Sequence, residues 1–281
     1  MNYHDVPELA AAYRNACLAE LRALKPGNVH DFALGHGGSV EDFEASARVS
    51  APALTRCGAS VGERVLGAVE ATHVHVGWNT NLGIVLLCAP LAAAAERAGS
   101  LRANLAEVLA MLSLADAVNT FAAIRLASPG GLGQADRHDV AAPPMVDLRM
   151  AMAAAAGRDR IARAYVTEFA EVFDIGLAAL RRARLRGLSD QWCATAVHMT
   201  FLSHAPDTHI ERKFGHESAE RVRVRASEIL RGVSLGPDAL APLLAFDAEL
   251  KKGDLNPGTT ADFTVATLFA AELMHSQPSN S

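Results

Sequence analysis

Five polar loops carry the residues that could do chemistry in this chain. Their sequences are KPGNVHDF (25–32), GWNTNLG (77–83), SPGGLGQADRHDV (128–140), PDTHIERKFG (206–215) and KKGDLNPGTTAD (251–262). Each loop combines His, Asp, Asn, Lys or Arg with Gly or Pro, so each could offer backbone N–H groups and charges to a phosphorylated ligand. The pattern predicts one site for such a ligand if the loops meet in space.

The loop at 77–83 leads into an apolar stretch that begins at Leu82. Asn79 or Asn81 could simply be the N-cap of the helix that follows. The same position places free N–H groups and the positive end of the helix dipole at the loop, which would suit a phosphate or a ribose hydroxyl. Asn79 and Asn81 are therefore candidate substrate-binding residues as well as candidate caps.

The loop at 128–140 carries the charged cluster Asp136, Arg137, His138 and Asp139. Such a cluster could be a solvated surface loop. Alternatively, Asp136 and Asp139 could hold Mg²⁺, with His138 between them as a general base. Because long loops inside compact domains are usually functional, we expect this one to line a site.

The loop at 206–215 offers a carboxylate and two cations. Asp207 follows Pro206 and could be no more than a helix cap. It could also be a metal or ribose ligand, because Arg212 and Lys213 nearby could clamp a diphosphate or triphosphate.

Helices must position these loops, because the composition favours them. Of the 281 residues, 50% are hydrophobic and only 5% aromatic, and alanine is abundant. The sequence predicts an all-α fold, a single-domain multi-helix bundle spanning 1–281 with polar loops converging on one site. Periodic apolar positions predict helices over 6–24, 40–71, 82–98, 102–127, 146–156, 158–186, 190–204, 211–231, 237–252 and 260–275.

Charge and cysteine content argue against several classes of function. The formal charge of −5 gives no basic field for a nucleic acid. The four cysteines form no C-x-x-C pair, so neither a disulfide framework nor a zinc knuckle is indicated, and a reducing cytoplasm fits best. His73-x-His75 has no third zinc ligand at a recognisable spacing.

The sequence also bears on location and partners. The first residues lack a signal-peptide pattern, and the longest apolar run, 82–95, is too short to cross a membrane. We therefore expect a cytoplasmic protein without a membrane partner, acting on small-molecule nucleotides. The alanine-rich helices would suit a homodimer interface.

Four stretches of the chain resemble a known family. They are KPGNVH, NTNLG followed by IVLLCAPLA, DTHIERKFG, and LNPGTTADFTVATLFAAEL, and they lie between residues 25 and 273 in the family's order. On these residues the chain resembles the triphosphoribosyl-dephospho-coenzyme A synthases, which are all-helical. The resemblance covers nearly the whole chain, and the last stretch is the most specific.

The resemblance implies a transferase. The family cleaves the N-glycosidic bond of ATP, releases adenine, and joins the triphosphoribosyl group to the 2′-hydroxyl of dephospho-coenzyme A. Such a reaction passes through an oxocarbenium-like centre. It calls for carboxylates or amide oxygens near the anomeric carbon, Mg²⁺ and basic groups on the phosphates, and a base near the attacking hydroxyl.

The residue types and the resemblance together predict a role for each candidate. KPGN could otherwise be only a helix stop, and Thr259-x-x-Asp262 only a capping box. The catalytic candidates are His30, His138, Asp139 and Asp207, with Asp31 an alternative to His30. The Mg²⁺ candidates are Asp136, Asp139, Asp207 and Asp262. The substrate or phosphate contacts are Lys25, Asn28, Asn79, Asn81, Arg212, Lys213, Asn256, Gly258 and Thr259.

The chain departs from the synthase pattern in two loops. It has Asn81-Leu82-Gly83 where the coenzyme A enzymes have His-Lys-Gly, and SPGGLG where they have an Arg-Gly-Glu loop. KPGNVH with SPGGLG and RHDV resembles a branch associated with archaea and methylotrophs. That branch leaves open a phosphoribosyl transfer from phosphoribosyl diphosphate in tetrahydromethanopterin biosynthesis. A metal-dependent hydrolase of a phosphorylated ligand and a non-catalytic nucleotide-binding module are further hypotheses.

Overall fold

The structure, a computed structural model, describes residues 6–32, 39–135 and 137–275. These residues form α-helices, one π-helical segment and one 3-10 turn without a strand, so the all-α prediction is confirmed. The elements are α1 Val6–Leu21, α2 Val40–Leu54, α3 Val61–Val76, α4 Leu82–Ala95, α5 Leu101–Ala110, α6 Leu114–Ala127, α7 Leu148–Ala155, α8 Arg160–Val166, η1 Glu171–Gly176, α9 Leu177–Leu185, α10 Asp190–His204, α11 Thr208–Phe214, α12 His216–Gly232, η2 Pro237–Ala239, α13 Leu240–Lys252 and α14 Gly258–His275.

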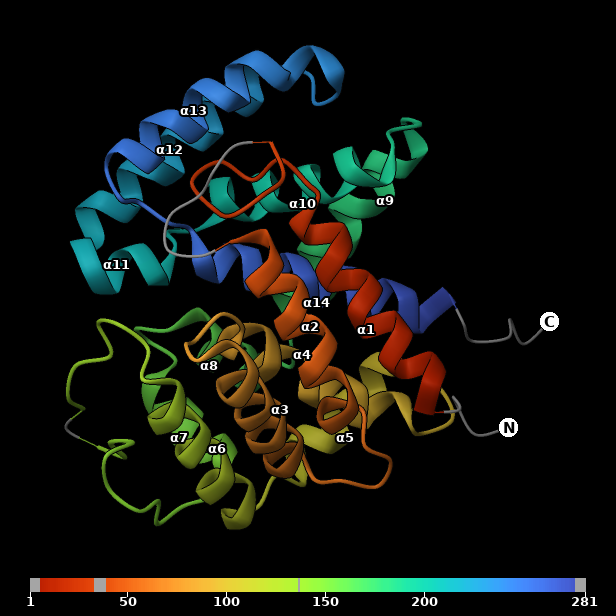
Figure 1. Ribbon diagram of the computed structural model, residues 1–281, viewed down its shortest axis with the longest axis vertical. Helices are drawn as coiled ribbons and strands as arrows, with labels where there is room; N and C mark the ends of the chain where they lie inside the picture. Colours follow the sequence, from red (N-terminus) through yellow and green to blue (C-terminus); the bar gives the residue numbers. More distant parts are fainter. Residues whose placement is uncertain (1–5, 33–38, 136, 276–281) are drawn as a thin grey trace.

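Helices α4 and α14 lie at the centre of the bundle (Figure 1). Both are buried around almost their whole circumference, as expected of helices without a polar face. Helix α14 packs against α1, α4 and α10, and α4 also packs against α3 and α5. Helices α11, α12 and α13 lie on one side of this centre, and α3, α6 and α7 lie on the opposite side (Figure 1).

Buried apolar side chains from both ends of the chain form one continuous core. The ring of Tyr13 in α1 meets Phe269 in α14 edge-on, with centroids 5.9 Å apart. The guanidinium of Arg160 lies 5.1 Å from the Phe263 ring centroid and forms an ion pair with Glu171. The core therefore fixes the first turns of α8 and α14 relative to each other.

Two predicted helices are wrong in extent because a capped turn interrupts each of them. The predicted helix 40–71 divides into α2 and α3 around Gly58, whose φ is +71°. The predicted helix 102–127 divides into α5 and α6, where Ser113 and Asp116 form a capping box. No single described helix is long and apolar enough to cross a membrane, although α5 and α6 together reach that length and composition across a 95° bend.

Two further predicted helices are also interrupted. The predicted helix 158–186 divides into α8, η1 and α9. Its break contains Glu168 and Phe169 at φ values of 52° and 58°, which non-glycine residues rarely adopt. The predicted helix 211–231 divides into α11 and α12 at Gly215, whose φ is +81°.

Candidate active site

One cavity of about 1000 Å³ lies between the two sides of the bundle. All five polar loops contribute to its lining, with Asn28, Gly77–Gly83, Ser128–Gly133, Arg212 and Asn256 among the residues that face it. The predicted convergence of the loops is therefore confirmed. The volume is at the upper end of the range for small-molecule sites, so a ligand larger than one mononucleotide fits.

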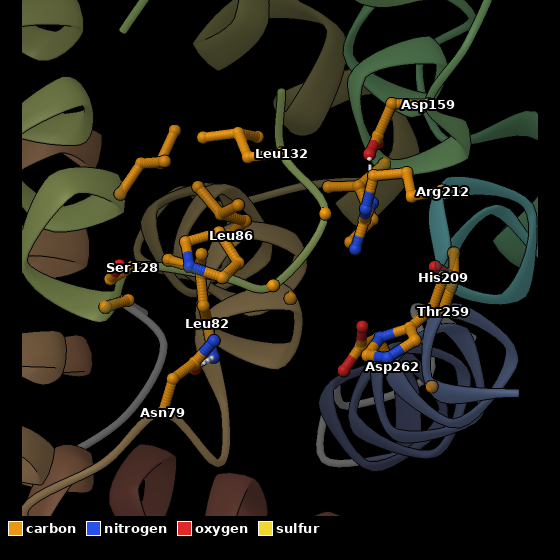
Figure 2. A pocket seen from close by; sticks show the side chains of 18 of the residues that line it. Asn79, Leu82, Leu86, Ser128, Leu132, Asp159, His209, Arg212, Thr259 and Asp262 are labelled. Atoms are coloured by element: carbon orange, nitrogen blue, oxygen red, sulfur yellow. Dashed lines mark hydrogen bonds and ion pairs between the residues drawn. The ribbon is translucent and has the colours of Figure 1, made fainter. Parts of the chain in front are cut away.

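The cavity has two chemically different walls (Figure 2). We call the first the apolar wall, and it consists of side chains from α4, α6, α7 and the polar loop at 128–140, which we call the glycine-rich loop: Leu82, Leu86, Phe121, Ile124, Leu132 and Met152. We call the second the polar wall, and it consists of side chains from the N-cap of α8, from α11 and from the first two turns of α14: Asp159, His209, Arg212, Lys213, Thr259 and Asp262. Such a pair of walls suits a ligand with a charged and an apolar part.

The cations of the polar wall are Arg212 and Lys213. Arg212 donates from Nη1 to Asp159 Oδ2 at 2.8 Å, and its Nε is buried without a partner among the described residues. The glycine-rich loop lies against this pair, because a Cβ at Gly131 would be 3.2 Å from the Arg212 carbonyl oxygen. Arg212 therefore keeps donors that a bound anion could use.

Asp207 lies behind the polar wall and does not line the cavity. Its Oδ1 accepts from the backbone N–H groups of His209 and Ile210, at 2.9 and 3.2 Å. Its Oδ2 accepts from the backbone N–H and the hydroxyl of Thr260, at 2.7 and 2.8 Å. The side chain thus joins the first turns of α11 and α14, and its role as a catalytic or metal-binding residue stays a prediction.

Asp262 faces the cavity from the second turn of α14 (Figure 2). Its carboxylate lies against the first turn of α4, where a Cβ at position 83 would overlap it, so a larger residue there must displace the carboxylate. Among the described residues, no hydrogen bond or ion pair reaches this carboxylate. Burial, reinforced by the charges of Asp207 and Glu20, raises the pKa of Asp262 well above its usual range.

The predicted capping box of Thr259 and Asp262 is wrong. Helix α14 begins at Gly258, before Thr259, and the cap on Thr260 comes from Asp207 instead. The Thr259 hydroxyl shares a hydrogen bond of 3.1 Å with the hydroxyl of Thr208. The Asp262 side chain is therefore available to the cavity.

His209 lies beside Asp262 on the polar wall (Figure 2). Its ring covers Gly258, where a Cβ would be 2.9 Å from Nδ1. Burial lowers the pKa of His209, and the Arg212 and Lys213 charges lower it further against the opposing effect of Asp207. The imidazole is therefore neutral at pH 7, and its Nε2 is buried without a partner among the described residues.

The first polar loop lies mainly behind the cavity. The Lys25 ammonium contacts Glu20 Oε1 and donates to Asn28 Oδ1 at 3.2 Å. Asn28 in turn donates from Nδ2 to Asn256 Oδ1 at 2.8 Å, and both amides line the cavity. Lys25 itself is buried and lies outside the lining, so direct phosphate contact by Lys25 stays a prediction.

His30 is also remote from the cavity lining. Its Nε2 lies 3.1 Å from Asp247 Oδ1, and the side chain is fully buried. Burial lowers the pKa of His30 despite the neighbouring Asp247 carboxylate. The same carboxylate accepts from the backbone N–H of Gly27 at 2.8 Å, so this group organises the loop, and a catalytic His30 stays a prediction.

Asn79 and Asn81 both line the cavity at the start of α4. The N-cap position of α4 is Asn81, but the side chain that accepts from the first helical N–H, that of Leu82, is Asn79 through its Oδ1 at 3.1 Å. Asn81 makes no side-chain cap hydrogen bond and donates from Nδ2 to the Thr72 hydroxyl at 3.0 Å. Substrate contact by either residue stays a prediction.

The glycine-rich loop brings His138 and Asp139 to the cavity. Both Asp139 oxygens accept from backbone N–H groups, of Ala135 at 2.6 Å and of Ala141 at 2.8 Å. These hydrogen bonds lower the pKa of Asp139. Asp136 lies outside the described residues, and within the described part of the chain no three His, Cys, Asp or Glu side chains are grouped closely enough to hold a metal ion.

Several lining residues escape the sequence reasoning. Asp159 caps α8 and Arg158 precedes it, inside the uninterrupted helix expected over 158–186. His209 and Trp78 lie within the expected loops, but neighbouring charged and amide side chains in those loops are the stronger candidates. Glu20 is on the last turn of α1, five residues before Lys25, and that spacing is the only pattern that could have indicated it.

The fold and the site together define a class of all-helical proteins with a large cavity. In this cavity cations and helix N-termini face an apolar wall, and such an arrangement suits a phosphorylated nucleotide. The chain belongs to the CitG family, described as ATP:dephospho-CoA triphosphoribosyl transferase, whose model matches residues 7–281. The family predicted from the four sequence stretches is thereby confirmed.

A solved structure agrees with this assignment. The chain is similar to a crystal structure from Archaeoglobus fulgidus, described as a candidate triphosphoribosyl-dephospho-CoA synthase, with 25% sequence identity and a TM-score of 0.64. The similarity covers 81% of this chain and 96% of that chain. None of the curated proteins compared with the chain gives a significant match.

Proposed function

We propose that this protein transfers the triphosphoribosyl group of ATP to the 2′-hydroxyl of dephospho-CoA and releases adenine. Membership of the family supports the reaction, and the two-walled cavity is the observation that carries the proposal to this site. A volume of about 1000 Å³ has room for a nucleotide donor and the nucleotide end of an acceptor.

The triphosphate would lie along the polar wall. Arg212 and Lys213 face the cavity there, and Arg158 lines it on the same side. Helix α14 begins at the cavity, where Gly258 and Thr259 line it, so the positive end of its dipole lies at this wall. Cationic side chains and a helix N-terminus are the groups that bind phosphate oxygens most strongly in proteins.

The apolar parts of the substrates would lie along the apolar wall. Leu82, Leu86 and Leu132 offer surface for an adenine ring or for the pantetheine arm of the acceptor. The anomeric carbon would then lie between the walls, near Asp262. An oxocarbenium-like transition state is stabilised by a carboxylate or amide oxygen at that position.

We propose that Mg²⁺ arrives with the triphosphate, outside any protein cage. Mg²⁺ usually retains several waters and binds substrate phosphates plus one or two carboxylates. Asp207 and Asp139 use their oxygens for hydrogen bonds to the chain, and the described residues provide no group of three ligands. Coordination of Mg²⁺ by the predicted carboxylates stays a prediction.

The proposal is tested by product analysis. The protein is incubated with ATP, dephospho-CoA and Mg²⁺, adenine is quantified by chromatography, and the second product is identified by its mass. We expect adenine and triphosphoribosyl-dephospho-CoA in equal amounts. Adenine release that does not need the acceptor would indicate a hydrolase, and absence of adenine would contradict the proposal.

The two alternative reactions receive less support. The description of the matching family names ATP and dephospho-CoA, so it favours neither phosphoribosyl diphosphate as donor nor water as acceptor. Substituting phosphoribosyl diphosphate for ATP in the same assay tests the first alternative directly. Transfer from that donor alone would replace the proposed reaction.

A further inference from the structure

We infer that Glu20 is a second proton-transferring residue of this cavity, accepting the proton of the attacking hydroxyl while Asp262 gives a proton to the departing adenine. The inference rests on the proposed function and deepens it, because it names a base and an acid for the transfer. Neither the sequence motifs nor the family description identifies Glu20.

Glu20 reaches the cavity from the last turn of α1. Its side chain is only 7% exposed, yet it lines the cavity, as Asn28 and Asn81 also do. Lys25, 1% exposed, contacts Oε1 of this carboxylate. A buried carboxylate costs several kcal/mol of desolvation unless a partner compensates it, and Lys25 is that partner.

Asp262 lines the same cavity in different surroundings. The negative charges of both carboxylates raise the pKa of Lys25 against the effect of burial, so both lie near its ammonium group. The direct contact of the ammonium group is to Glu20. Two carboxylates that share a low-dielectric site do not readily ionise together, so the pair holds one proton. The ammonium contact keeps the charge on Glu20, and the proton therefore resides on Asp262.

The pKa shift of Asp262 agrees with this arrangement, whereas burial acts against it at the ion pair by raising the pKa of Glu20 and lowering that of Lys25. Burial raises the pKa of Glu20, and Lys25 opposes that shift. Burial raises the pKa of Asp262 well above its usual range, and the nearby carboxylates add to the rise. The charged or titratable groups facing the two carboxylates are Cys17, Lys25, Cys88, Asp159, Asp207, His209 and Arg212.

The proton and electron balance closes without another reactant. The acceptor oxygen forms a bond to the anomeric carbon, and the bond from that carbon to the adenine nitrogen breaks with its electron pair going to adenine. Glu20 takes the hydroxyl proton, and Asp262 gives its proton to adenine. Transfer of the proton from Glu20 to Asp262 restores the starting state, so the hydroxyl proton ends on adenine.

The test separates the base from the acid by changing the leaving group. Glu20→Gln, Asp262→Asn and the exposed control Glu8→Gln are assayed with dephospho-CoA and either ATP or 6-chloropurine riboside triphosphate, whose purine leaves more readily without a proton. On ATP we expect each cavity variant to lose about 10²–10⁴-fold in kcat, and the control to lose nothing. On the chlorinated donor, Asp262→Asn should recover most of its rate and Glu20→Gln should not.

A pH profile tests the role of Lys25 as a positioning residue. If Lys25 keeps Glu20 ionised, Lys25→Met raises the pKa of Glu20 and moves the acid limb of kcat/KM to higher pH. Glu20→Gln should abolish that limb. A limb that stays in place in both variants would contradict the inference.

Folding is controlled separately, because Glu20→Gln leaves Lys25 buried without its ionic partner. The double variant Glu20→Gln with Lys25→Met removes both charges, and its thermal unfolding and ATP binding are measured beside its activity. A folded double variant without transfer activity supports the base role. Transfer within a few-fold of the native rate in either Glu20 variant, or recovery of Glu20→Gln on the chlorinated donor, would overturn the inference.

The two proposals fail in different ways. If the native protein releases no adenine from ATP and dephospho-CoA, the proposed function fails and the inference falls with it. If the native protein transfers and the Glu20 variants also transfer, only the inference fails.

Discussion

Asp207 and Asp262 flank the first turns of α14, yet their surroundings are opposite. Asp207 is buried behind the polar wall, and its two oxygens accept four hydrogen bonds from α11 and α14. Asp262 faces the cavity, and no hydrogen bond within the described structure reaches it. These two carboxylates, one from the loop at 206–215 and one from the loop at 251–262, therefore have different roles.

Hydrogen-bond donors around a carboxylate decide whether it is structural or reactive. Hydrogen bonds from helix N–H groups hold a carboxylate in one orientation and join it to the helix, which serves structure. Without such donors, burial raises the pKa of a carboxyl group and favours its protonated form, which serves proton transfer. Availability in the cavity, and not residue type, separates the two roles.

The largest expected effect is that of Asp262→Asn on the reaction. Because the amide cannot exchange the proton, kcat for triphosphoribosyl transfer should fall about 10²–10⁴-fold. The KM for ATP should change little, since the cations of the polar wall remain. Steady-state kinetics with both substrates measures this, and a variant of nearly native kcat would place the chemistry elsewhere.

The next largest effect is that of Asp207→Ala on folding. Loss of four hydrogen bonds at two helix N-termini should cost about 3 kcal/mol and lower the Tm by roughly 5–10 °C. Asp147→Ala is a matched control, because Asp147 caps α7 through a single hydrogen bond from Met150, and it should cost about 1 kcal/mol. Equal destabilisation of both variants, measured by thermal unfolding, would contradict the role given to Asp207.

A smaller effect is expected when a methyl group is placed against Asp262. In Gly83→Ala the new Cβ must displace the Asp262 carboxylate, and kcat should fall about tenfold because reacting groups tolerate little misplacement. Gly157→Ala is the control, since nothing lies within 4 Å of a Cβ there. A Gly83 variant with native kcat would show that the carboxylate position is unimportant.

The smallest effect concerns the pH dependence of stability. The pKa of Asp262 is raised in the folded state, so the stability it contributes is complete below its unfolded pKa, about 3.9, and is lost as the pH rises through the folded pKa. Asp262→Asn lacks this dependence. Urea unfolding from pH 5 to pH 8 should therefore show Asp262→Asn gaining stability relative to the native protein, and a constant difference would refute the shift.

Sequence reasoning goes far for the fold and for the loops that form the cavity. Helical periodicity and alanine content suffice for an all-α bundle, and Gly, Pro and Asn indicate where the loops lie. The periodicity does not predict the helix break at Glu168 and Phe169, because neither residue type is typical of a left-handed backbone conformation. Their conformation depends on the packing of Phe169 in the core, which local sequence does not show.

The direction of each side chain is the part that sequence reasoning misses. Lys25 and Asp207 lie in the expected loops, but each turns to a partner inside the protein, Glu20 and Thr260 respectively. The partner of Asp207 is 53 residues away along the chain. Only tertiary structure reveals that these side chains support the cavity from behind while Asp262 enters it.

The hydrogen bonds of Asp207 also have a consequence for synthesis of the chain. Helix α14 follows every other described helix, and it supplies Thr260, Asp262 and the centre of the core. During translation, the polar wall therefore cannot close until α14 has left the ribosome. A nascent chain halted before Gly258 would have α11 without its partner helix and an incomplete cavity, so competence for ligand binding is acquired only once α14 has been synthesised.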